Sequence, residues 1–244
     1  MTDDGFDLYS NSGGLIRVTN PVRRKILTCL ASSCLSLTEI SGLTGKAQST
    51  LSVHLDKMTN EGLVESKSCT ADSRKKIFSL SAKLLAHTRG TSEEGMEAYV
   101  KTIDTITEPG CNFFKVLLRA MIVATEASGL CISPFMRLLG RRVGHSLSKK
   151  ITSTKVEDII GELQEFYEKH DMGEVCVYTF MPLTIIVRDN YEVTLCAAES
   201  ISKFSQELFL TVLVELTKKD YTITADECFG AGNNYSKFVL EQII

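Results

Sequence analysis

The sequence has few histidines, no long apolar run and a start that does not resemble a secretory leader. Its four histidines show neither metal-ligand nor catalytic spacing relative to acids and cysteines; they are His54, His87, His145 and His170. No hydrophobic stretch is long enough to cross a membrane, and the acidic start MTDDGFD is unlike a signal peptide. We therefore expect a cytoplasmic protein that is not an enzyme, carries no cofactor and does not contact a membrane.

Eight cysteines are present without a secretory signal. This combination argues against a disulfide scaffold and for reduced thiols, some of them reactive. With 43% hydrophobic and 23% charged residues, the chain has the composition of a globular protein, and its 244 residues are enough for two domains with separate cores.

Charge is distributed unevenly along the chain. Residues 1–90 contain 12 Lys and Arg against 8 Asp and Glu, a net charge of +4, whereas the remainder contains 15 against 22, a net charge of −7. Nucleic acid should therefore bind to the N-terminal part only, with an affinity that falls as salt rises. Because +4 is modest, a single copy would bind weakly, so we expect a homodimer on a roughly palindromic operator.

The segment 36–80 has the order of a winged helix-turn-helix, namely a short helix, a tight turn, a polar-faced helix and a basic hairpin. In the helix that begins near Ala47, the spacing of Leu51, Leu55 and Met58 predicts a buried face. The polar side chains remain on other faces, where short hydroxyl and amide groups suit base edges and phosphates.

The flanking residues complete this pattern. The preceding helix should bury an apolar side that includes Leu43, with Gly45 in the turn, and Gly62 should end the second helix. Residues 63–68 and 75–80 predict the two strands of the wing. The predicted DNA contacts are polar or basic side chains of the second helix and the wing: Lys46, Gln48, Ser49, Thr50, Ser52, His54, Lys57, Ser73, Arg74, Lys75 and Lys76. For His54, packing or capping is an open alternative.

At these residues the chain resembles the ArsR/MarR class of regulators. That class writes its recognition helix roughly as S-x-S-T-x-S-x-H-L-x-x-L-x-x-x-G-L-V and follows it with a basic wing. The matching positions are Ser49, Thr50, Ser52, His54, Leu55, Met58, Gly62, Leu63, Val64, Phe78 and Leu80. The resemblance implies binding to double-stranded DNA, with a winged helix used only for protein contacts as the alternative. Metal-sensing members carry a cysteine pair where this chain has LTEISGL, so metal sensing through this domain is not expected.

Two further helices are predicted around this module. Residues 20–30 form a scaffold helix with Asn20 as its cap. Its basic flank is interpreted as a solvated face, with phosphate contact as the alternative: Arg23, Arg24 and Lys25. Glycines and a Pro-Gly pair then mark a boundary, and residues 91–110 predict a linker helix that contributes to dimerisation. Its apolar stripe comprises Met96, Tyr99, Val100, Ile103 and Ile106.

Residues 111–244 predict a second domain of mixed structure. Three helices begin near residues 113, 134 and 156, and the period then changes to two over 174–180, 184–188 and 191–196. A long helix over about 200–218 and two last strands follow. This order favours an α+β sandwich.

The second half resembles the vinyl-4-reductase sensor domain through the segments LLGRRVGHSL, DNYEVTLC and ADECFGAGNNYSKFVL. Together with the first half, the chain resembles methanogen-type archaeal regulators that couple an ArsR-like domain to such a sensor and respond to redox state. The resulting prediction is an α+β protein with a winged helix-turn-helix at 1–90, a linker at 91–110 and an α/β sandwich sensor domain at 111–244.

Zinc-carrying relatives of the sensor domain hold the metal with one acid and three cysteines. Glu192 and Cys228 match two of these places, and Cys196 is a substitute by geometry. Ser236 stands where the last cysteine should be, and a hydroxyl is a poor zinc ligand, so no metal is expected.

The cysteines near the predicted sheet are the candidate redox-sensing residues: Cys176, Cys196 and Cys228. Simple burial as small apolar side chains is the alternative. Cys69 beside the basic wing is a further candidate, because cations favour the thiolate. The sequence thus predicts a transcriptional regulator controlled through cysteine oxidation; the alternatives are control by a small-molecule ligand or metal in the second domain, or a tethering or scaffold protein that does not bind DNA.

Overall fold

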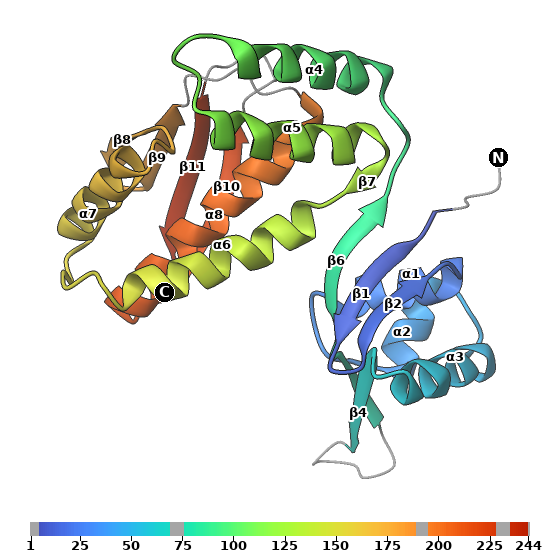
Figure 1. Cartoon of the computed structure of the whole chain (residues 1–244). Helices are drawn as coiled ribbons and strands as arrows, with labels where there is room; N and C mark the ends of the chain where they lie inside the picture. The colour runs from blue at the N-terminus through green and yellow to red at the C-terminus, as the bar shows by residue number, and fades with distance from the viewer. Residues whose placement is uncertain (1–4, 69–75, 189–194, 228–234, 244) are drawn as a thin grey trace. The chain divides into compact units, whose positions relative to one another are not determined.

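The computed structural model describes residues 5–68, 76–188, 195–227 and 235–243 (Figure 1). The chain divides into two compact units, Met1–Arg89 and Gly90–Ile244. Helices and strands are mixed in both, which confirms the predicted α+β class. Within the described ranges, no helix combines the length and apolar character that a membrane crossing requires.

The first unit opens with a hairpin that the sequence analysis did not predict. Strand β1 (Asp7–Asn11) pairs antiparallel with β2 (Gly14–Val18) on one side and with β6 (Lys83–Thr88) on the other. The Asn11 side chain accepts a hydrogen bond from the backbone of Gly13 at 2.8 Å, which closes the turn between β1 and β2.

Three helices and a small sheet complete this unit. The helices are α1 (Pro21–Leu30), α2 (Leu37–Thr44) and α3 (Gln48–Asn60). The antiparallel sheet has the order β3-β5-β4, formed by β3 (Leu35–Ser36), β4 (Val64–Ser68) and β5 (Lys76–Leu80). The predicted order of helix, turn, helix and hairpin is therefore confirmed, as is the cap of α1, where the Asn20 side chain accepts hydrogen bonds from the backbone of Val22 and Arg23.

The second unit contains five α-helices within the described residues. They are α4 (Glu93–Asp104), followed by a 3-10 turn (Thr105–Thr107), then α5 (Phe113–Ala127), α6 (Ser133–Ser148), α7 (Val156–Lys169) and α8 (Leu195–Thr217). A two-residue strand, β7 (Leu130–Cys131), separates α5 from α6. The helix expected as a linker, α4, packs on α5 within this unit, and Tyr99 joins a small core with residues of α5, α6 and α8.

A four-stranded antiparallel sheet in the order β10-β11-β9-β8 forms the rest of the second unit. Its strands are β8 (Glu174–Phe180), β9 (Leu183–Arg188), β10 (Tyr221–Glu227) and β11 (Tyr235–Gln242). Helices α7 and α8 cover one face of this sheet (Figure 1). The core between these helices and the sheet includes Tyr167, Ile185, Phe209 and Phe238.

One predicted strand is wrong in its last two residues. Leu195 and Cys196 begin α8 instead of ending a strand over 191–196, and residues 191–194 lie outside the described part of the chain. Helix α8 needs this earlier start because Ala197 and Ala198 are buried, with Ala197 in the core that α8 shares with α5 and α6.

Candidate nucleic-acid interface

The turn between α2 and α3 is fixed by local hydrogen bonds. Ser36 and Glu39 form a reciprocal capping box, in which the Ser36 backbone donates to the Glu39 carboxylate at 2.7 Å. Helix α2 ends at Gly45, whose φ of 68° is the left-handed conformation that glycine adopts without strain. The Ser41 hydroxyl donates to the carbonyl of Lys46 at 2.8 Å. These contacts set the direction in which α3 leaves the turn.

Helix α3 is held along one side and at its end. The residues predicted to form its buried face have no exposed surface: Leu51, Leu55 and Met58. The helix stops at Gly62, with a φ of 71°, and the Asn11 amide donates to the carbonyl of Glu61 at 2.8 Å. The N-terminal hairpin therefore anchors the carboxyl end of α3, and the opposite face of the helix is left toward solvent.

The exposed side of α3 carries most of the predicted DNA contacts. Gln48, Ser49 and Thr50 are exposed in the first turn, and Lys46 and Lys57 are exposed before and after them. Ala47 occupies the N-cap position, and its methyl side chain cannot accept the hydrogen bonds of the first-turn amides. Those amides are therefore available to an anion such as a phosphate.

The other two predicted contacts on α3, Ser52 and His54, are only half exposed. Leu43, expected on the buried side of α2, is 56% exposed, because Ile40 and Thr44 provide the buried positions of that short helix. Sequence reasoning also missed Val53, which is 69% exposed in the middle of α3. The helical spacing that places Leu51 and Leu55 inside already puts Val53 on the opposite face.

The two strands of the predicted wing are present as the β4–β5 hairpin. Ser68 pairs with Lys76 at the outer end of the β4–β5 hairpin, and Lys67 and Lys76 are exposed there. A hydrogen bond from Ser79, followed by the neighbouring Lys67 ammonium at 3.3 Å, holds the pKa of Glu65 below its usual value. The remaining predicted wing contacts lie outside the described residues: Ser73, Arg74 and Lys75, together with the candidate thiol Cys69.

The basic flank of α1 has a structural role instead of being a solvated face. Arg23 forms an ion pair with Glu61, and the Arg24 guanidinium lies 3.1 Å from a carboxylate oxygen of Asp7. The Lys25 ammonium donates to the last carbonyl of α2, on Thr44, at 3.2 Å. These cations tie α1 to the N-terminal hairpin and to both neighbouring helices.

The predicted redox cysteines are only partly within the described structure. Cys176 lies on β8 opposite Ile186, and Cys196 lies in the first turn of α8. Cys228 and the weak metal candidate Glu192 fall outside the described residues. Among the residues that are described, no three His, Cys, Asp or Glu side chains gather closely enough to hold a metal ion.

Cys176 lies in surroundings that disfavour its thiolate. Burial is the largest cause that raises the pKa of this thiol, and its hydrogen bond and charge repulsion with Glu174 raise it further. Arg188 acts in the opposite direction but does not cancel these effects. Because the thiolate is the nucleophile in disulfide chemistry, these surroundings lower the fraction of Cys176 that can attack at neutral pH.

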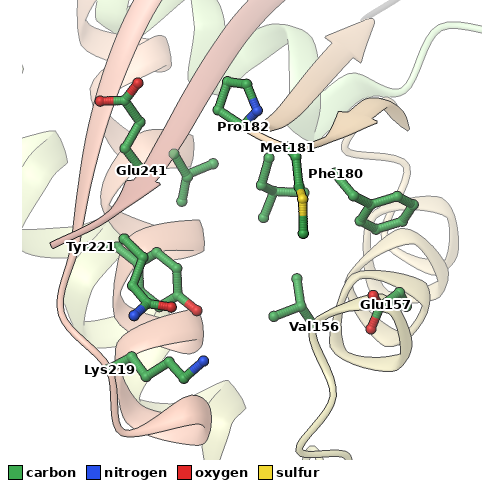
Figure 2. Close-up of a pocket in the computed structure, with 11 residues that line it drawn as sticks. Val156, Glu157, Phe180, Met181, Pro182, Lys219, Tyr221 and Glu241 are labelled. Atoms are coloured by element: carbon green, nitrogen blue, oxygen red, sulfur yellow. The ribbon is translucent and has the colours of Figure 1, made fainter. Parts of the chain in front are cut away.

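A groove of about 570 Å³ lies at one end of the sheet in the second unit. Figure 2 shows Met181 reaching from the β8–β9 turn toward Val156, the first residue of α7, with Phe180 and Tyr221 on either side. The charged lining residues are Glu157, Lys219 and Glu241. Its volume lies in the range of small-molecule sites, and its walls combine apolar and charged groups.

Residues 20–66 match the family described as bacterial regulatory protein, arsR family. The first unit carries an arsR-family helix-turn-helix domain. Such a domain supports binding to double-stranded DNA and a role in transcription regulation. An uncharacterized protein of Methanocaldococcus jannaschii is 30% identical over 105 residues, which are 42% of this chain and 44% of the relative. The match thus spans less than half of that protein from a methanogenic archaeon.

Two solved structures resemble the chain over 62% of its length. One is a vinyl-4-reductase family protein from Methanocaldococcus jannaschii, with 14% identity, a TM-score of 0.37 and 94% of that protein covered. The other is an H-NOX protein from S. oneidensis, crystallised with its iron in the Fe(II)NO ligation state, with 12% identity, a TM-score of 0.36 and 91% covered.

Proposed function

We propose that this chain is a transcriptional regulator that binds operator DNA through α3 and the β4–β5 wing. The observation that carries this proposal is the two-sided character of α3, which buries Leu51 and Leu55 and exposes polar groups over its first turn. The arsR-family match over 20–66 supports the same reading. Gln48, Ser49 and Thr50 are the proposed base-reading residues, since short amide and hydroxyl groups match base edges.

The proposed phosphate contacts lie on either side of these residues. Lys46, Lys57 and Lys76 are exposed cations, and Arg74 and Lys75 continue the wing in the sequence. Such contacts strengthen binding to every sequence and make it dependent on salt. Base contacts, in contrast, separate the operator from other DNA.

We further propose that the regulator acts as a homodimer through the outer faces of α4 and α5. These two helices pack together, and their large exposed apolar side chains are Met96, Val100, Phe113, Phe114, Leu118 and Met121. Phe114 alone is 78% exposed. A second copy is the proposed cover because two copies double the modest positive charge available to DNA and match a palindromic operator.

The proposed role of the second unit is to control DNA binding. Oxidation of two thiols to a disulfide, with two electrons and two protons passed to an oxidant, is the input that the resemblance to the sensor domain implies. The candidates are Cys176, Cys196 and Cys228. The raised pKa argues against Cys176 as the thiol that is oxidised first. The groove beside Met181 favours a second input, a small molecule with an apolar body.

The test is a binding titration of the full-length protein on DNA from upstream of its own coding sequence and on unrelated duplex of equal length. Binding is measured with reductant and again after diamide. Under the proposal, the upstream duplex binds more tightly, the preference changes on oxidation, and replacing a responsible cysteine by serine removes that change. A response that persists in all three serine variants excludes these thiols as the input. Equal, weak binding to both duplexes favours a tethering or scaffold role.

A further inference from the structure

Val53 is an apolar residue in the middle of the polar face of α3. It lies four residues after Ser49 and four residues before Lys57, so the three side chains line up along one side of the helix. This side is opposite the buried positions Leu51 and Leu55. If α3 enters the major groove, Val53 therefore meets the base pairs at the centre of the contact.

Packing within the first unit does not account for valine at this position. The apolar residues of the buried face are fully covered, whereas Val53 leaves 69% of its surface to solvent. A β-branched residue is also less favourable than alanine in an exposed helix position, because its side chain has restricted rotamers there. Contact with an apolar group outside the chain would explain why valine occupies this position, whereas core packing and helix propensity do not.

The major groove of DNA presents one apolar group on its base edges, the C5-methyl of thymine. We propose that Val53 packs against a thymine methyl and thereby selects a T·A pair within the operator. This inference rests on the proposed binding of DNA through α3. Ser49, one turn earlier, then reaches a neighbouring base edge, and Lys57, one turn later, reaches the backbone.

The experiment uses the full-length protein and a duplex selected from a random-sequence library by repeated binding. Each dT of the selected duplex is replaced in turn by dU, which removes only the methyl group. We expect at least one replacement to weaken binding of the parent chain about fourfold, the effect of one methyl group removed from water. The Val53→Ala variant should bind this dU duplex and the dT duplex equally.

Two further variants control for indirect effects. Val53→Ile keeps an apolar side chain and should retain the discrimination between dT and dU. Leu15→Ala removes an equally exposed apolar side chain on β2 and should discriminate like the parent.

The outcomes separate the inference from the proposed function. If the parent binds all dU duplexes as tightly as the dT duplex, or if Val53→Ala still loses affinity at the same position, Val53 is an ordinary exposed residue and the inference is overturned. The proposed function then stands, because a sequence was selected. If the selection enriches no duplex, both are overturned.

Discussion

Gly140 of α6 lies against the carbonyl oxygen of Phe204 of α8. A Cβ atom added at Gly140 would lie 2.2 Å from that oxygen, and one at Gly144 would lie 2.9 Å from the carbonyl oxygen of Leu208. The two glycines therefore allow two helix backbones to approach more closely than any side chain permits. An ion pair between Arg141 and Glu207 flanks this contact at 3.0 Å.

Replacing Gly140 by alanine should destabilise the second unit by about 3 kcal/mol, because α6 and α8 must move apart to admit the methyl group. The measurement is a calorimetric unfolding scan of the full-length protein. Gly161→Ala in α7 is the matched control, since its added Cβ meets no described atom within 4 Å. That variant should gain up to about 1 kcal/mol from helix propensity. Equal effects of the two substitutions would contradict the close packing of α6 on α8.

Substitutions on the two faces of α3 should have different effects, one on stability and the other on DNA binding. Leu55→Ala leaves a cavity under the helix and should cost about 2–5 kcal/mol of the unfolding free energy of the first unit. Lys57→Ala changes an exposed side chain and should alter stability by less than about 0.5 kcal/mol. It should nevertheless weaken binding to all DNA sequences. The prediction fails if Lys57→Ala binds DNA as the parent does under low salt.

Stability should depend on Glu215 in a defined pH range. Partial burial raises the pKa of this carboxyl, but hydrogen bonds with Ser148 and His145 and the charges of His145 and Lys218 outweigh it, so the pKa lies below its usual value of 4.5. A pKa lowered by folding means that the carboxylate stabilises the folded state above pH 4.5, and that this contribution disappears as pH falls through the lowered value.

The Glu215→Gln variant should therefore melt at a lower temperature than the parent at pH 7, and the difference should shrink as the pH falls below the usual value of 4.5. Thermal melts followed by circular dichroism across this range provide the measurement. Glu168→Gln, on the exposed side of α7, serves as the control and should track the parent at every pH. A constant difference for Glu215→Gln would show that its charge has no part in the effect.

A charge on the outer face of α5 should prevent dimerisation. Phe114→Glu places a carboxylate in the proposed interface, where it would have to lose its hydration, and sedimentation equilibrium should report a monomer. Met181→Glu changes another exposed apolar side chain, on the β8–β9 turn, and should leave the dimer intact. A parent chain that sediments as a monomer would contradict the proposed homodimer.

Local patterns were sufficient for the helix-turn-helix and the wing. The spacing of Leu51 and Leu55 gave the buried face of α3, and Gly62 gave its end. The hairpin of β1 and β2 was missed because two of its residues reverse the usual rule that apolar side chains are buried and charged ones exposed. Asp7 is buried, while Leu15 is exposed. Asp7 is tolerated inside because it pairs with Arg24, a partner that no local pattern reveals.

In the second unit, too, local patterns predicted some elements, whereas one boundary depends on contacts with distant parts of the chain. Alternating apolar residues gave β8 and β9, and helical spacing gave α7. The start of α8 was wrong because the alternating residues before Ala197 resemble a strand locally. The helix propensity of Ala197 and Ala198, and the burial of Ala197 against α5 and α6, favour the helix instead. Val53 was not among the predicted contacts because only polar and basic side chains of α3 were considered for DNA binding.

The most direct test of DNA recognition by α3 and the wing is a comparison of two affinities of the full-length protein, one for its selected duplex and one for random duplex. Both affinities are measured across a salt series for the parent, for Gln48→Ala and for Lys76→Ala. We predict that Gln48→Ala narrows the gap between the two duplexes about tenfold, the worth of one good base contact. Lys76→Ala should weaken both duplexes alike and reduce the salt slope by about one. Unchanged specificity in Gln48→Ala together with an unchanged salt slope in Lys76→Ala would contradict the account.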